Sequence, residues 1–307
     1  MKTKKILTWC LRFFIGLILI VILINKIDAT KIIDQILNMD LIILPLFLLL
    51  FPIVFLATAL NIKFVLDSLG EKIKTLKVLK NTLIAQSIGS FLPGRLGEVS
   101  VAYLLKKEGI NYGKSLLALI IDKIATFSAV SIFSICAFFI FFEKKIALEL
   151  SLGLVMLMIA ACFCLMSNKI REIIRKFILR KYACLFAGFS KGLFYIIRKK
   201  KSILVLAFLI KVTMMVSLSL IIYLLLIAFG ADVSFLYILI IHSVGTLSAQ
   251  IPISIAGLGI RESIAVYMFS QSGVDPAVAG AVYLMMLAFS YLITGTVLIY
   301  YSQKIRI

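Results

Sequence analysis

The chain has 307 residues, of which 63% are apolar and 15% are charged, and its formal net charge is +19. A soluble domain has roughly a quarter charged residues, so this composition excludes a water-soluble fold. The basic residues lie between apolar runs, which is typical of orientation signals in membrane loops and argues against a nucleic-acid-binding surface.

Apolar runs of roughly 18 or more residues recur along the chain, long enough to cross about 30 Å of hydrocarbon as helices. The first run has no small-residue cleavage site after it, so we expect an anchor span and no signal peptide. Two further regions, 82–106 and 235–271, are apolar but interrupted by proline, glycine and charge. The sequence therefore predicts an all-α polytopic membrane protein. Its regular spans are 6–24, 41–61, 116–142, 146–166, 202–228 and 278–301.

The distribution of basic residues predicts the orientation. With the N-terminus in the cytoplasm, most of the 33 lysines and arginines fall on the cytoplasmic side and most loop acids fall outside. This is the positive-inside pattern. It requires each irregular region to cross an even number of times, or to enter the membrane and return. We therefore expect a multi-pass inner-membrane protein with both termini in the cytoplasm.

The segment 168–201 is rich in lysine and arginine, has one acid, Glu172, and carries apolar residues at roughly helical spacing. One interpretation is an amphipathic helix on the inner leaflet, bound to anionic lipid. The other is a basic loop that only fixes the topology. The sequence leaves both open.

The two irregular regions match each other. Residues 91–98 read FLPGRLGE and residues 251–262 read IPISIAGLGIRE, and their glutamates, Glu98 and Glu262, lie 164 positions apart. The same offset carries the span 116–142 onto 280–306, where the last span lies. We infer a duplication with halves at about 1–142 and 146–307. The residues expected to shape the two hairpins are Pro93, Gly94, Gly97, Pro252, Gly257 and Gly259.

The predicted orientation makes the halves inverted copies. The first break is entered from the cytoplasm and the second from outside, so each half has about three transmembrane helices and one re-entrant broken-helix hairpin. Inverted repeats with broken helices are typical of transporters, because two related halves can expose one site alternately to each side. The alternative is a duplicated structural scaffold.

Seven charged residues remain at membrane depth after the loops are assigned, and each needs a partner, a cavity or water. Arg95 and Arg261 are candidates for gripping a phosphate or another anionic headgroup. Their neighbouring glutamates could neutralise them, cap the following half-helix or carry a proton. The alternative is an internal Arg–Glu pair that only shapes each hairpin. The full set is Arg95, Glu98, Asp122, Lys123, Lys211, Arg261 and Glu262.

Other polar positions are more ambiguous. Lys211 lies near the midplane and could pair with Glu98, Glu262 or a passing anion, and Asp122 indicates a polar patch. His242 could relay protons or form a structural hydrogen bond. Gln250, with Thr246 and Ser248, could line a polar path or simply pack helices.

Common catalytic patterns are missing from the sequence. It contains no Walker loop, HExxH, Cys/His metal spacing or Gly-x-Ser-x-Gly motif. We expect no catalytic residues, no metal and no cofactor.

The two motifs resemble the lysylphosphatidylglycerol synthetase transmembrane region, the flippase-like domain of the multiple peptide resistance factor. The resemblance covers nearly the whole chain. It implies movement of a phospholipid between leaflets, or an accessory role in cell-envelope lipid or glycan assembly. In the full enzyme a soluble aminoacyl-transferase domain follows. This chain ends at Ile307, just past the last span, so we expect that activity to be absent.

Three functions follow as hypotheses. The first is a flippase for an anionic, aminoacylated or polyprenyl-linked lipid. The second is a membrane-embedded glycosyl- or acyl-transferase with Glu98, Asp122 or Glu262 as the base. The third is a non-transporting scaffold whose 168–201 segment recruits a partner synthase. A homo-oligomer is a further expected form, and nucleic acid is not an expected partner.

Overall fold

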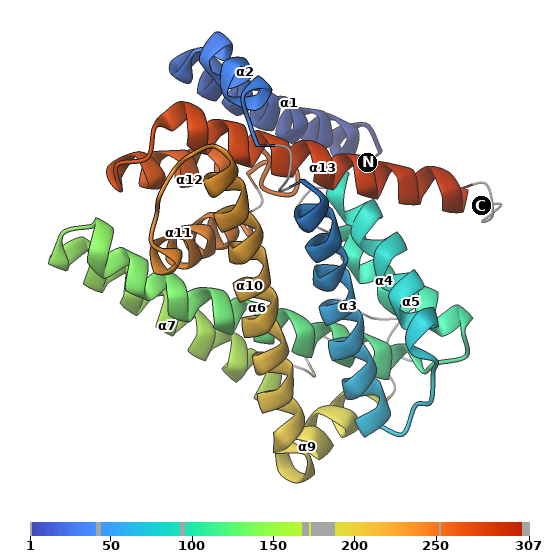
Figure 1. Cartoon of the computed structure of the whole chain (residues 1–307). Helices are drawn as coiled ribbons and strands as arrows, with labels where there is room; N and C mark the ends of the chain where they lie inside the picture. The colour runs from blue at the N-terminus through green and yellow to red at the C-terminus, as the bar shows by residue number, and fades with distance from the viewer. Residues whose placement is uncertain are drawn as a thin grey trace.

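The computed structural model describes residues 2–40, 44–92, 96–167, 172, 188–251 and 253–302. Its regular elements in these ranges are helical (Figure 1). They are α1 (Lys2–Ile27), α2 (Ala29–Leu37), α3 (Leu44–Ser68), α4 (Thr75–Ser90), the 3₁₀ helix η2 (Leu96–Val99), α5 (Ser100–Lys107), α6 (Tyr112–Phe141), α7 (Lys144–Met166), α9 (Phe189–Lys199), α10 (Lys201–Ala228), α11 (Phe235–Ser248), α12 (Ile260–Gln271) and α13 (Pro276–Ser302).

A long helix covers each of the six predicted spans. Within the described residues, five helices are long and apolar enough to cross a membrane: α1, α6, α7, α10 and α13. The remaining predicted span, 41–61, corresponds to α3, a helix of 25 residues. The prediction of an all-helical membrane protein is therefore confirmed. The start of α6 lies before the predicted residue 116, because Asn111 caps it by accepting a hydrogen bond from the Lys114 amide at 3.2 Å.

The two irregular regions form helical hairpins. In the first, α4 packs against α5 and the 3₁₀ helix η2, and in the second, α11 packs against α12. The longest arms, α4 and α11, have 16 and 14 residues. At 1.5 Å per residue they reach about 24 and 21 Å, less than the thickness of a hydrocarbon core. Such helices suit hairpins that turn back.

Each hairpin packs against the long helix that follows it and against the corresponding helix of the other half. α6 contacts α5 and α11, while α13 contacts α12 and α4. Figure 1 shows α4 beside α13 on one side of the molecule and α11 beside α6 on the other. α3 and α10, which the offset of 164 relates, pack against each other. The cross-packing places the helices of both hairpins around one interior, and the inverted orientation of the halves stays a prediction.

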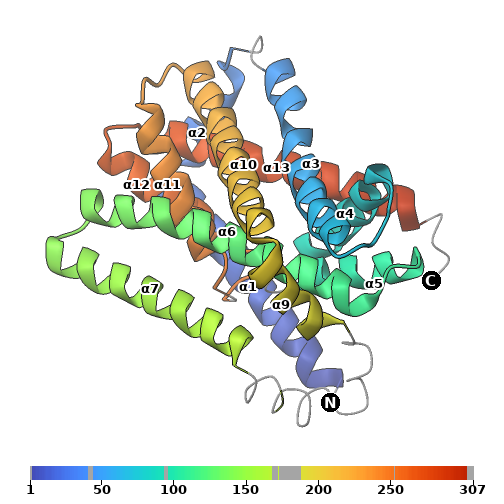
Figure 2. The ribbon, with the colours of Figure 1, turned by 90° about the horizontal axis from the view of Figure 1, so that it is seen from below.

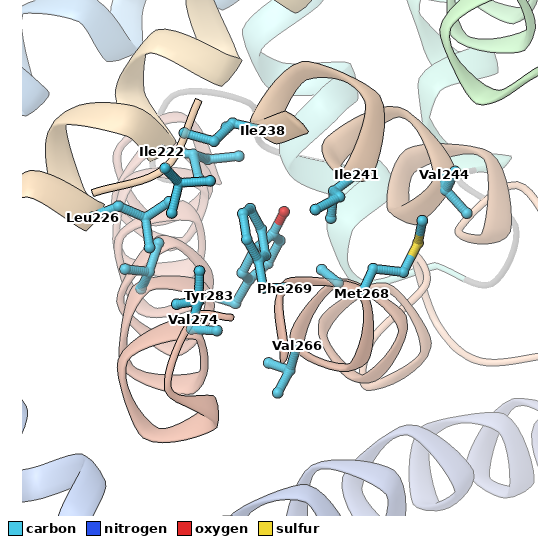
Figure 3. Packing of buried hydrophobic residues seen from close by; sticks show 14 of the residues in the cluster. Ile222, Leu226, Ile238, Ile241, Val244, Val266, Met268, Phe269, Val274 and Tyr283 are labelled. Carbon is cyan, nitrogen blue, oxygen red and sulfur yellow. The ribbon is translucent and has the colours of Figure 1, made fainter. Parts of the chain in front are cut away.

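The larger buried core lies among α10, α11, α12 and α13. Phe269 and Tyr283 sit at its centre with ring centroids 6.1 Å apart, and aliphatic side chains such as Ile222 and Ile241 surround them (Figure 3). A second buried cluster joins α3, α4, α5, α6 and α9. These two cores hold the hairpins in place by apolar packing.

α7 lies at the edge of the bundle. It packs beside α6 (Figure 2) and leaves large apolar side chains such as Met156, Ile159 and Phe163 more than half exposed. Exposed apolar surface of this extent is expected of a helix that faces lipid.

Most of the predicted amphipathic segment 168–201 lies outside the described residues, but its last turns form α9. Leu193 and Ile196 are buried, whereas Lys191 and Arg198 are exposed. The described part of the segment therefore has one apolar face and one basic face.

Candidate functional site

A cavity of about 210 Å³ lies between the two hairpins. Residues of α3, α4, α6, α10, α11, α12 and α13 line it, together with η2 and the turn after α11. Four of the predicted site residues reach its wall: Glu98, Asp122, Lys211 and Arg261. Glu262 is fully buried behind Arg261. The structure thus gathers charges from both halves around one space.

Asp122 on α6 and Lys211 on α10 form an almost completely buried ion pair in the cavity wall. Their side chains are 1% and 2% exposed, and Lys211 Nζ lies 2.6 Å from Asp122 Oδ1. Asn61 on α3 donates to the same oxygen at 2.8 Å, and Lys211 donates to Thr58 Oγ1 at 3.2 Å. A buried charge needs such a partner because desolvation is costly. The sequence suggested Glu98, Glu262 or a passing anion as partners of Lys211, whereas the ion pair that the structure shows is with Asp122.

The neighbouring residue on α6, Lys123, forms an ion pair with Glu98 of η2. Its side chain is 45% exposed, whereas that of Glu98 is 10% exposed. Consecutive helical residues point about 100° apart, which is why α6 can contact α10 with one charge and η2 with the next. Glu98 therefore pairs with a cation from the first half of the chain.

The third pair is local to the second hairpin. Arg261 donates to Glu262 Oε1 from Nε at 3.0 Å and from Nη2 at 2.6 Å. The other carboxylate oxygen of Glu262 accepts from the Gly259 amide at 2.8 Å, at the start of α12. Of the three roles considered for this glutamate, the structure shows two, which are neutralising the arginine and capping the helix. The cap suits a carboxylate because the first turn of a helix leaves amides unpaired and carries positive charge.

The hairpin glycines permit close backbone approach. A Cβ at Gly97 would overlap the backbone of Gly89 at the end of α4. Gly257 has φ +81°, and its Cβ would overlap Ala249 after α11. A side chain at either position would push the turn away from its own first arm. Four other predicted site residues, Pro93, Gly94, Arg95 and Pro252, lie outside the described residues.

Comparison with known families assigns the chain to one of them. A family model described as the lysylphosphatidylglycerol synthase TM region matches residues 9–297. The chain belongs to this family. No curated protein matches it. Both hairpins and the whole lining of the cavity fall within the residues matched to the lysylphosphatidylglycerol synthase TM region. Family membership supports a membrane role related to lipid.

In this lysylphosphatidylglycerol synthase TM region, neutral polar side chains complete the cavity wall. Gln250 and Thr246 line it, as one interpretation of the sequence predicted. His242 also lines it, and its Nε2 lies 3.4 Å from Thr246 Oγ1. Within the described residues its Nδ1 has no hydrogen-bond partner. Gln86 on α4 lines the wall too, and sequence reasoning missed it.

A signal for Gln86 was present in the sequence. Gln86 and Gln250 lie 164 positions apart, the offset that separates Glu98 from Glu262. Thr126 and Ser290, which also line the cavity, have the same offset. A search for polar residues repeated at this offset would have found Gln86.

Proposed function

We propose that this protein is a lipid flippase of the inner membrane, with both termini cytoplasmic, and that the cavity between the hairpins receives the lipid headgroup. The observation that carries the proposal is the meeting of charged residues from both halves at one cavity. Drug-sized ligands occupy pockets of about 300–1,000 Å³, so a volume of about 210 Å³ suits a headgroup whose acyl chains stay in the bilayer.

Arg261 and Lys123 are the cations proposed to meet the headgroup phosphate. Both line the cavity, and each already interacts with a carboxylate. An arriving phosphate exchanges with that carboxylate, so the cation is never left without an anion. The guanidinium of Arg261 suits this exchange because its fork of N–H donors binds phosphate oxygens in pairs.

The two related hairpins supply the means of changing access. Each is held between helices of both halves, so a shift of one half against the other opens the cavity toward one leaflet and closes it toward the other. In this proposal the basic face of α9 binds anionic lipid of the inner leaflet, through residues that include Lys191 and Arg198.

The test is lipid translocation in proteoliposomes, followed by dithionite quenching of acyl-chain-labelled phosphatidylglycerol. Arg261→Lys keeps the charge but removes the paired donors. One lost charge-assisted hydrogen bond is worth roughly 1.5–3 kcal/mol, so transport slows about tenfold or more. Lys123→Ala gives a similar loss, and Arg95→Ala tests the same role for the arginine of the first hairpin.

Lys145→Ala is the matched control, because Lys145 is an exposed lysine on α7 away from the cavity. It leaves the rate unchanged. Unimpaired transport by folded Arg261→Ala and Arg95→Ala variants would rule out this mechanism, and a wild-type protein that moves no lipid would refute the flippase itself.

A further inference from the structure

The charged side chains of the cavity wall are already engaged. Among the residues that the structure describes, the ionised groups at the wall are Glu98, Asp122, Lys123, Lys211 and Arg261. Each has an oppositely charged partner. A headgroup recognised only by charge must therefore displace a carboxylate, which gives little discrimination among lipids that all carry a phosphate. Discrimination has to come from groups that are free to bind.

Two side-chain amides at the cavity wall are available to bind a headgroup. Gln86 comes from the first arm of the first hairpin, and Gln250 follows the first arm of the second. Both line the cavity. Within the described part of the chain, neither amide has a hydrogen-bond partner. Their separation by 164 residues places one amide in each half at matching positions of the hairpins.

The chemistry of an amide selects among headgroup atoms. A primary amide has two N–H donors and a carbonyl acceptor. A phosphate oxygen only accepts and an ammonium only donates, so each uses one side of the amide. A hydroxyl both donates and accepts, and neighbouring hydroxyls of a polyol use both sides.

We propose that Gln86 and Gln250 bind the hydroxyl groups of a polyol headgroup, such as glycerol or a sugar, and so determine which phospholipid the cavity accepts. This inference rests on the proposed flippase activity and names its substrate class. Sites built to hydrogen-bond a hydroxyl discriminate strongly against analogues that lack it, because the polar groups of the site are then left unpaired. The cations proposed to meet the phosphate, Lys123 and Arg261, supply attraction for it, and the amides supply the selection.

The experiment compares two lipids of equal charge. Phosphatidylglycerol carries two hydroxyls on its headgroup, and phosphatidylpropanol has the same three-carbon headgroup without them. Both are prepared with the same acyl-chain label and measured in proteoliposomes of wild type, Gln86→Leu, Gln250→Leu and the double variant. Gln271→Leu is the matched control, since Gln271 is an exposed glutamine at the end of α12, away from the cavity.

Wild type and the control transport phosphatidylglycerol at least tenfold faster than phosphatidylpropanol. Each single variant loses part of this preference, and the double variant moves both lipids at the slower rate. Retained transport of phosphatidylpropanol shows that the variants are folded. Equal rates for both lipids in wild type, or an unchanged preference in the double variant, would overturn the inference.

A binding assay distinguishes failure of this inference from failure of the flippase proposal. Native mass spectrometry of the detergent-purified protein measures retention of the same two lipids without any transport step. If wild type moves neither lipid, the flippase proposal fails, while preferential retention of phosphatidylglycerol that disappears in the double variant still supports the role of the amides. Equal retention of both lipids would refute that role.

Discussion

The buried ion pair between Asp122 and Lys211 can be tested by its contribution to the stability of the protein. Asp122→Asn keeps an acceptor for Asn61 but leaves Lys211 without an opposite charge, and Lys211→Met leaves Asp122 with only neutral partners. Removing one partner of a buried pair costs about 3–5 kcal/mol. With roughly 2–4 °C per kcal/mol for chains of 150–250 residues, each single variant lowers the apparent Tm by about 6–20 °C.

The double variant Asp122→Asn/Lys211→Met removes both charges together. Replacing a whole buried pair is often neutral or stabilising, so its apparent Tm lies above that of either single variant. Intrinsic-fluorescence melting in detergent measures all three, with exposed Lys145→Met on α7 as the control that does not change. Single variants as stable as wild type would show that these charges do not depend on each other. A double variant less stable than both singles would refute the pairing.

Three further predictions test other parts of the structure. Gly97→Ala lowers the apparent Tm in the same melting assay because its Cβ meets the backbone of α4, whereas Gly153→Ala, with open space around it, raises or preserves the Tm. Glu262→Gln removes the negative charge that accepts three hydrogen bonds, and it costs roughly 1.5–3 kcal/mol of stability, read from the same melts. In a cysteine-free background, impermeant maleimide labels Lys107→Cys from the cytoplasmic side and Ser272→Cys from the outside, and labelling of both from one side would contradict the inverted topology.

The spans could be predicted from the sequence because their signal is local. An apolar run such as 202–228 can be recognised from its composition alone, and the bounds of α10 (Lys201–Ala228) agree with it to within one residue. The hairpins could be placed because proline, glycine and charge interrupt the same kind of run. Helix ends were less accurate, since the start of α6 depends on a cap at Asn111 that hydropathy does not detect.

The partners within the site were harder to predict, and the reason is distance along the chain. The Arg261–Glu262 pair joins neighbours and was among the considered pairings. The Lys211–Asp122 pair joins helices that meet only through tertiary packing, so nothing in local spacing indicated it. Gln86 escaped notice for another reason. An uncharged amide costs little in an apolar segment compared with a charge, so it does not stand out in a hydropathy pattern.

The three ion pairs differ in how readily each can exchange with a headgroup. Asp122 and Lys211 are almost completely buried and tie α6 to α10, so separating them exposes two charges to an apolar interior. Lys123 is 45% exposed, and its ammonium can leave Glu98 for a phosphate while staying in contact with water. Adjacent residues of one helix thus hold a fixed pair and an exchangeable pair. In the proposed cycle α6 keeps its contact with α10 as the cavity changes access, and the headgroup passes from Lys123 on α6 to Arg261 on the second hairpin.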